Sequence, residues 1–271
     1  MIGQKELLNQ IDTLASNGKF PKFSIVIGEE GYGKHTLCKY ISEKLGLDYL
    51  LFNNKIDDLR TFIDVVSTQA DPFVYILQDG DSMALGAKNS ILKIVEEVPP
   101  QAYIILLINN RNSALATLIS RAFVFELNNY SIDELYTYCD MKGYTNKLDL
   151  VSVANCPGEI DNASKLDVRA LIDYAEKLLD NISKYSLPQT VQVSSMLNGT
   201  NSQGYDIRLF LNAMYSVMTR RLESGEARNC LKLYRDICLL ISEYSYKLRM
   251  RAVNLKYLVD NFLINLWRIT G

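Results

Sequence analysis

The stretch "GEEGYGKHTL", residues 28–37, directly follows the apolar run "FSIVIG", residues 23–28. A short β-branched run that ends in glycine predicts a buried strand, and the loop after it follows the phosphate-binding pattern G-x-x-x-x-G-K-[ST] except at its last position. The matching residues are Gly28, Gly33 and Lys34. The last position requires a hydroxyl group but holds His35, the only histidine in the chain. The order of strand, loop and helix therefore predicts a phosphate loop with one altered residue. A tight glycine turn without a ligand is the alternative.

The chemistry of this loop favours phosphate over a metal ion. Its candidate nucleotide-binding residues are Gly28, Gly31, Gly33, Lys34, His35 and Thr36. Glycines let successive backbone N–H groups face one phosphate, and Lys34 would reach the β- and γ-phosphates. His35 offers an imidazole where Mg²⁺ prefers oxygen. Thr36 lies about 100° further round the helix, so its hydroxyl is not equivalent. We expect a loop that can bind ATP or ADP but holds Mg²⁺ poorly.

A second segment, "FVYILQDGDSM" (residues 73–83), shows the same change. In phosphate-loop proteins an apolar strand ends in a carboxylate that positions Mg²⁺. Here the first polar position is Gln78, which carries no charge, and the next is Asp79. Together with His35, these residues predict a degenerate nucleotide site with no metal site. A core strand with an ordinary polar end is the alternative.

Apolar runs alternate with amphipathic segments through the first half of the chain. The predicted strands are residues 23–28, 48–53, 72–79, 102–109 and 122–127. Amphipathic segments separate them, and this alternation predicts a parallel sheet with helices on both faces. After residue 128 the strand pattern fades and the remaining chain reads as helix. The predicted fold class is an α/β core followed by helical domains.

Composition narrows the choice of function. The chain has 271 residues, 48% of them hydrophobic and 22% charged, with a net charge of −2, which excludes a general polycation. Residues 1–165 carry 15 basic and 21 acidic side chains, and residues 166–271 carry 14 and 10, so the two parts have charges of −6 and +4. Five cysteines without a C-x-x-C pair favour a reducing compartment. With no apolar leader or bilayer-length run, we expect a cytoplasmic protein with no membrane partner.

Two further segments resemble one family. "AKNSILKIVEEVPP" (87–100) and "AYIILLINNRNSALATLISRA" (102–122) resemble the bacterial clamp-loader AAA+ subunits, which carry an N-x-L-L-K-x-L-E-E-P-P helix, a sensor-1 strand and a T-I-x-S-R-C segment. The positions that match are Asn89, Leu92, Lys93, Glu96, Glu97, Pro99, Thr117, Ser120 and Arg121. The resemblance covers residues 1–128 well; beyond residue 165 it rests on helical character and length.

This resemblance implies an AAA+ phosphate-loop core (1–128), a small helical lid (129–165) and an all-α collar (166–271). Within the family the chain looks like the delta-prime subunit of the DNA polymerase III clamp loader, a stator without ATPase activity of its own. Arg121 then stands for an arginine finger, used in trans; an arginine that only caps a helix is the alternative. The implied partners are tau/gamma-type and delta-type subunits in a hetero-oligomer such as a pentamer, the sliding clamp and primed DNA.

The sequence also departs from the family pattern. The four-cysteine zinc module of many bacterial members is absent, so no zinc is expected. The sensor-2 region keeps Pro157 and Gly158 but has Glu159 where the family places an arginine. Two other functions stay open. One is an active AAA+ clamp-loader ATPase in which Thr36 and Asp79 restore Mg²⁺ binding. The other is a stand-alone AAA+ adaptor or helicase-loader-like protein that binds partners without a clamp.

Overall fold

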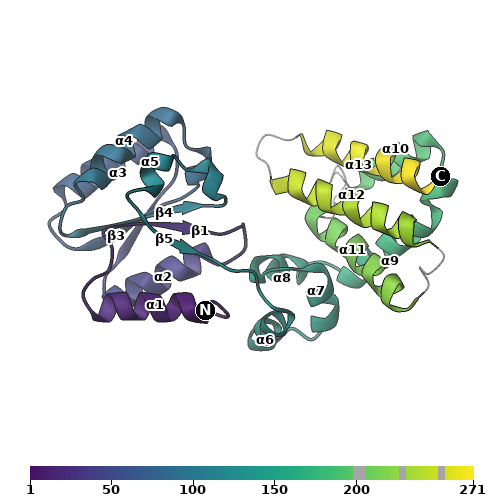
Figure 1. Cartoon of the computed structure of the whole chain (residues 1–271), viewed down its shortest axis with the longest axis horizontal. Coiled ribbons are helices and arrows are strands. Elements are labelled where there is room, and N and C mark those ends of the chain that lie inside the picture. The colour runs from purple at the N-terminus through teal and green to yellow at the C-terminus, as the bar shows by residue number, and fades with distance from the viewer. Residues whose placement is uncertain (198–205, 226–229, 250–253) are drawn as a thin grey trace. The chain divides into compact units, whose positions relative to one another are not determined.

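The computed structural model describes residues 1–197, 206–225, 230–249 and 254–271 (Figure 1). These residues form two compact units. The first comprises Met1–Tyr138 and Cys156–Gly158, and the second comprises Cys139–Asn155 and Glu159–Gly271. The finer division into 1–128, 129–165 and 166–271 stays a prediction.

The first unit is built on a five-stranded, fully parallel sheet in the order β2-β3-β4-β1-β5. The strands are β1 (Phe23–Ile27), β2 (Tyr49–Phe52), β3 (Phe73–Leu77), β4 (Ala102–Ile108) and β5 (Phe123–Glu126). Every residue of β1 is buried because this strand lies inside the sheet, between β4 and β5. The predicted strands and their parallel arrangement are confirmed. At the sheet edge, β2 exposes three large apolar side chains: Tyr49, Leu50 and Leu51.

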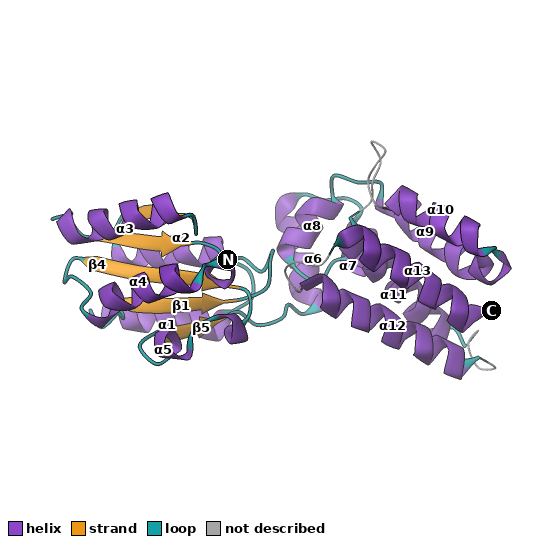
Figure 2. Cartoon of the chain, turned by 90° about the horizontal axis from the view of Figure 1, so that it is seen from above, coloured by secondary structure: helices purple, strands orange, loops and turns teal. Residues whose placement is uncertain are grey.

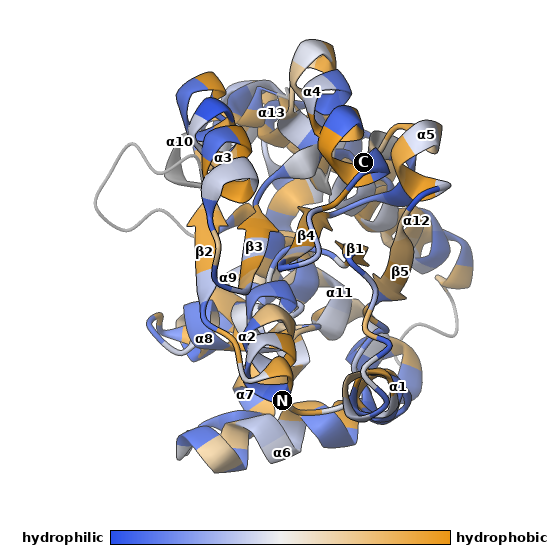
Figure 3. Ribbon diagram, turned by 90° about the vertical axis from the view of Figure 1, so that its left-hand side faces the viewer, coloured by the Kyte–Doolittle hydropathy of each residue, from blue (hydrophilic) through white to orange (hydrophobic). Residues whose placement is uncertain are grey.

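Helices cover both faces of this sheet (Figures 2 and 3). They are α1 (Lys5–Ser16), α2 (Lys34–Leu45), α3 (Ile56–Thr68), α4 (Leu85–Glu96) and α5 (Ala116–Ile119), with 3-10 turns η1 (Gly80–Ser82) and η2 (Arg111–Ser113). Alternate strand residues point to opposite faces. Ile25 therefore joins the core beneath α3, α4 and α5, whereas Val26 joins the core beneath α1 and α2. The period-2 alternation of buried residues thus builds two hydrophobic cores.

The regular secondary structure of the second unit, in the residues that the structure describes, consists of helices. Its elements are the end of α6 (Ile132–Lys142), α7 (Lys147–Val153), most of α8 (Pro157–Ala163), α9 (Val168–Asn181), η3 (Ile182–Lys184), α10 (Leu187–Leu197), α11 (Ile207–Glu223), α12 (Leu231–Arg249) and α13 (Leu255–Thr270). Helix α11 packs on α9 and α12, and α13 packs on α10 and α12. Among the helices that the structure describes, none combines the length and hydropathy that a bilayer-spanning segment needs.

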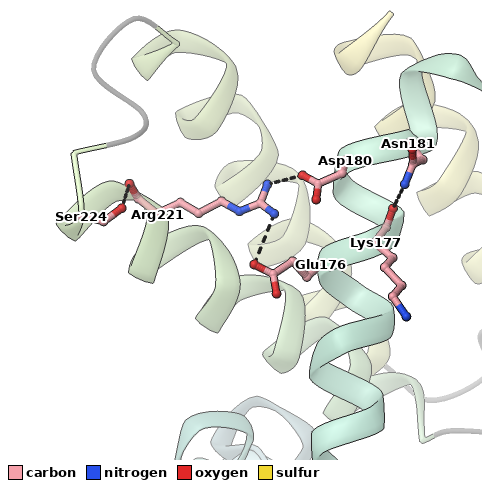
Figure 4. Close-up of polar contacts among 6 residues, drawn as sticks. All are labelled: Glu176, Lys177, Asp180, Asn181, Arg221 and Ser224. Atoms are coloured by element: carbon pink, nitrogen blue, oxygen red, sulfur yellow. Dashed lines mark hydrogen bonds and ion pairs between the residues drawn. The ribbon is translucent and has the colours of Figure 1, made fainter.

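One arginine joins two helices of this unit (Figure 4). Arg221, near the end of α11, contacts two carboxylates one turn apart on α9. Its Nη1 lies 2.8 Å from Asp180 Oδ1, and its Nη2 lies 3.5 Å from Glu176 Oε1. Only 16% of the arginine side chain is exposed. Burial, the largest single influence, lowers the pKa of Arg221, but the contributions of Asp180 and Tyr234 together outweigh it, and the pKa is raised. The guanidinium therefore acts as a cross-link between α9 and α11.

Candidate functional site

The residues predicted for the nucleotide site lie at one edge of the parallel sheet. The phosphate loop follows the last residue of β1, Gln78 follows β3, and Asn109 follows β4. Parallel strands end at the same edge, so these three segments converge there. This is the position at which open α/β sheets bind ligands. The sequence placed the loop and Gln78 here, but it did not single out Asn109.

The loop backbone requires glycine at two positions. Gly31 has φ 84° and Gly33 has φ 91°, both in the left-handed region that side chains disfavour. A Cβ at Gly28 would lie only 2.8 Å from Leu127 Cδ1, so this position is restricted by packing. Helix α2 begins directly after the loop, at Lys34. The loop therefore keeps the backbone geometry by which N–H groups at a helix start can face an anion.

The ammonium group of Lys34 is bonded within the chain. Its Nζ donates to Gly28 O at 2.6 Å, to Glu29 O at 2.9 Å and to Asn109 Oδ1 at 2.7 Å. An ammonium has three N–H donors, so these contacts use all of them. Burial lowers the pKa of Lys34, and nearby carboxylates, led by Asp81, oppose that shift. A phosphate would have to replace at least one of these oxygens to reach the lysine.

Asp81 holds the backbone of Asn109, whose side chain is a partner of Lys34. Its Oδ2 accepts the Asn109 N–H at 2.8 Å, and its Oδ1 accepts the Asn110 N–H at 3.2 Å. The carboxylate thereby anchors the backbone after β4, and that backbone carries the Asn109 side chain toward Lys34. In the sequence, Asp81 lies within the segment 73–83 but was not singled out. The one available signal for Asn109 was a polar residue directly after an apolar strand.

Two positions at the loop do not match the donors that Mg²⁺ prefers, although the carboxylates of Asp79 and Asp81 lie near Lys34. His35 supplies an imidazole nitrogen and Gln78 an uncharged amide, whereas Mg²⁺ is bound through carboxylates and other oxygens. Desolvation and the charge of Lys34 lower the pKa of His35, and Asp79 opposes that shift. Asp79 itself has a left-handed backbone, with φ 53°. In the part of the chain that the structure describes, no group of three His, Cys, Asp or Glu side chains is arranged to hold a metal ion.

A short strap, defined as Cys156–Gly158, lies against the phosphate loop. The Gly158 N–H donates to Gly31 O at 3.0 Å, and a Cβ at Gly158 would come within 2.4 Å of Gly31 Cα. The Cys156 thiol lies 3.7 Å from Glu30 O and donates to it. Glycine at position 158 is therefore required by a backbone-to-backbone contact. The sequence matched this residue to the family but gave no signal for the contact.

The neighbouring candidate, Glu159, has a structural role in the second unit. Its Oε2 accepts the Asn155 N–H at 2.8 Å and the Asn212 side-chain amide at 3.4 Å. These bonds satisfy a backbone donor just before α8 and tie α8 to α11. These two hydrogen bonds account for a glutamate at position 159 without any contact to a nucleotide.

Arg121 lies at the other edge of the sheet from the phosphate loop. It precedes β5, whose residue Phe123 pairs with Ser24 near the beginning of β1, whereas the loop follows Ile27 at the end of β1. Its Nη2 lies 2.9 Å from Glu96 Oε1, and its Nη1 donates to Thr117 O at 3.0 Å. Helix α5 begins only at Ala116, because η2 and an extended Ala114 and Leu115 precede it. Arg121 therefore lies outside the helix and caps its end.

This geometry defines a class. A five-stranded parallel sheet with helices on both faces, a phosphate loop after β1 and a following helical part give an AAA+ fold. The Holliday junction branch migration motor RuvB of Thermotoga maritima aligns with a TM-score of 0.51 at 13% identity, over 83% of this chain and 78% of that one. This likeness concerns the fold.

Sequence comparisons identify the relatives. The family model "DNA polymerase III, delta subunit" matches residues 50–131. A DNA polymerase III subunit gamma from Buchnera aphidicola subsp. Schizaphis graminum is 22% identical over 67% of this chain and 59% of that protein. Another, from Buchnera aphidicola subsp. Acyrthosiphon pisum, is 23% identical over 51% of this chain and 47% of that protein. The matched part thus spans about half the length of these curated relatives. The chain is therefore similar in sequence to subunits of DNA polymerase III.

Proposed function

We propose that this chain is a delta-prime-type stator of a clamp loader, which does not hydrolyse ATP itself and donates Arg121 to the ATP site of a neighbouring subunit. The observation that carries the proposal is the separation of the two sites within the first unit. The phosphate loop lies at the carboxyl edge of the sheet, and Arg121 lies at the amino edge. Five residues of β1 separate the edges by about 15 Å. Arg121 is thus placed to act on a phosphate outside its own subunit.

The phosphate loop supports the non-hydrolysing part of this proposal. Lys34 makes three internal bonds, and both positions that normally help to bind Mg²⁺ have lost their oxygen anion or hydroxyl. A nucleotide that binds here must compete with Asn109 for the lysine. Without Mg²⁺ its phosphates would lack the charge neutralisation that phosphoryl transfer requires.

The proposed assembly follows from the family relation. Tau/gamma-type subunits would hydrolyse ATP and a delta-type subunit would open the sliding clamp, with this chain completing a cytoplasmic hetero-oligomer on primed DNA. The helices of the second unit would form the collar that holds the ring together. Their exposed apolar residues include Leu239 and Tyr246 on α12 and Tyr257 on α13, which are suited to contact sister subunits.

The first test concerns ATP turnover by the purified chain. We expect a steady-state ATPase rate at the level of the buffer control, unchanged by Lys34→Ala. A rate above background that Lys34→Ala abolishes would exclude the stator function. Thr36→Ala and Asp79→Asn should then also be measured, because these residues carry the active-site alternative.

The second test concerns the arginine. In an assembly reconstituted with tau/gamma-type and delta-type subunits, Arg121→Ala should lower turnover at the receiving site by about 10³-fold while leaving the mass of the complex unchanged. Arg121→Lys keeps the charge but not the planar fork of donors, and should also be defective. Arg111→Ala is the matched control, since Arg111 makes an exposed ion pair with Glu126 in the same unit. Equal turnover in wild type and Arg121→Ala would leave Arg121 as a helix cap only.

An active gamma-type ATPase is the second candidate, and one observation favours it: both curated relatives reported above are gamma subunits. That function needs Thr36 and Asp79 to restore Mg²⁺ binding. Adding Mg²⁺ to the purified chain with a fluorescent ATP analogue separates the candidates. A gamma-type subunit should bind more tightly with Mg²⁺, whereas the stator should show no gain.

A further inference from the structure

The carboxylate of Glu96 lies beside the guanidinium of Arg121. We propose that Glu96 is a positioning residue that holds this guanidinium in the orientation in which it meets a neighbour's phosphate. This inference rests on the proposed function, since it deepens the role of Arg121. Glu96 would act on ATP hydrolysis at the neighbouring subunit only through Arg121.

The contacts fix the guanidinium at both of its terminal nitrogens. Nη2 contacts Glu96 Oε1 at 2.9 Å, and Nη1 donates to Thr117 O at 3.0 Å. Two anchors on different nitrogens restrict rotation about the last side-chain bonds. A guanidinium has five N–H donors, and these contacts use two of them. Three donors therefore stay available to a phosphate while the group is held in place.

The anchors belong to packed helices. Glu96 is the last residue of α4, which ends shortly before Pro99 and Pro100, and Thr117 lies in α5. These helices pack against each other, and Val95 of α4 and Leu118 of α5 join the same buried core. The packed core therefore fixes the positions of Glu96 and Thr117, and their contacts in turn restrict the side chain of Arg121.

Exposure indicates that the pair is arranged for a partner. The side chains of Arg121 and Glu96 are 39% and 52% exposed. An ion pair this open to water contributes little to folding, because solvent screens it. The same openness leaves the guanidinium accessible to an anion from another subunit. A contact that orients the guanidinium before the reaction lowers the entropy that is lost in reaching the transition state, and so accelerates the reaction.

The test uses the reconstituted assembly with Glu96→Ala and Glu96→Gln. We expect Glu96→Ala to lower kcat by about tenfold with the KM for ATP unchanged, since the arginine acts on the transition state. Glu96→Gln keeps an oxygen acceptor and should recover part of the loss. Glu97→Gln is the matched control: this neighbouring carboxylate is exposed, and within the described residues it makes no hydrogen bond or ion pair. If Glu96 only supported folding, its substitution would not lower kcat while leaving KM unchanged.

The same series separates failure of the inference from failure of the proposed function. Arg121→Ala without effect would overturn the proposed function. A defect in Arg121→Ala together with wild-type kcat in Glu96→Ala would overturn only the role of Glu96. The double variant should be no slower than Arg121→Ala alone, because Glu96 acts through the arginine; an additional loss would also overturn the inference. Urea unfolding of each purified variant shows that the chains compared are folded.

Discussion

Arg221 and Arg121 illustrate two uses of the same side chain in one molecule. Arg221 is 16% exposed and is bonded to two carboxylates on a neighbouring helix, whereas Arg121 is 39% exposed and is bonded to one carboxylate and one carbonyl. Burial of the Arg221 guanidinium reduces solvent screening, so its contacts connect α9 and α11 more firmly than an exposed arginine would, although Glu176 and Asp180 are themselves 43% and 51% exposed. The second pair orders a group that stays accessible. Burial and the number of charged partners therefore distinguish a structural arginine from one available to a partner.

The largest expected effect tests that distinction directly. Arg221→Ala should lower the free energy of unfolding by roughly 2–3 kcal/mol, chiefly because it removes the packed stem of the arginine. Glu176 and Asp180 lose their partner, but they are 43% and 51% exposed and stay partly hydrated. Arg121→Ala should lower it by less than about 1 kcal/mol. Urea unfolding of the purified chain measures both. Arg220→Ala is the control on the exposed side of the same helix turn, and equal losses at positions 121 and 221 would contradict the distinction.

A carboxylate bonded within the chain should behave like Arg221. Asp81→Ala should lower the free energy of unfolding by about 2 kcal/mol, because the N–H groups of Asn109 and Asn110 lose a charged acceptor. Asp71→Ala, at an exposed position just before β3, should change it by less than about 0.5 kcal/mol. If Asp81→Ala and Asp71→Ala are equally stable, the bonds from Asp81 to the backbone after β4 do not contribute to stability.

The sequence was sufficient for the sheet because each strand is a continuous apolar run. Such runs indicate burial on both faces, with the exception of the edge strand β2, and the alternation with amphipathic helices leaves little choice of topology. The strand order itself, with β1 between β4 and β5, is a three-dimensional arrangement that no periodicity encodes. The start of α5 is likewise not evident from the sequence, because the extended backbone at Ala114 and Leu115 interrupts a segment of apolar, helix-compatible residues.

The site was predictable only where the chemistry is contained in a contiguous motif. Lys34 could be found from its loop, but its partner Asn109 lies 75 positions away and shares no pattern with it. The strap contact between Gly158 and Gly31 is likewise non-local and involves backbone atoms, which leave no signature except the glycine itself. The role of Glu159 was inferred from a motif position, whereas its bonds are determined by Asn155 and Asn212.

A smaller effect is expected at a polar group that the chain leaves without a partner. The Tyr75 hydroxyl on β3 is buried and, within the described residues, has no hydrogen-bond partner. Tyr75→Phe should therefore raise the free energy of unfolding by up to about 1 kcal/mol, because it removes a buried unsatisfied group and keeps the ring. The urea midpoint of the variant, compared with wild type at the same pH, measures this. A clear loss of stability would show that the hydroxyl is bonded.

The smallest effect concerns His35, the residue that interrupts the phosphate-loop pattern. Desolvation and the charge of Lys34 lower its pKa below the unfolded value of 6.5, with Asp79 opposing. As the pH falls below 6.5, the unfolded chain binds this proton more readily than the folded chain does, so the histidine's contribution to stability is lost on acidification. Wild type should lose more stability than His35→Asn between about pH 8 and about pH 5, by a small margin because the ring is exposed. Urea midpoints of both chains across this range measure the difference. A smaller loss in wild type would mean that Asp79 dominates and that the folded chain favours the imidazolium.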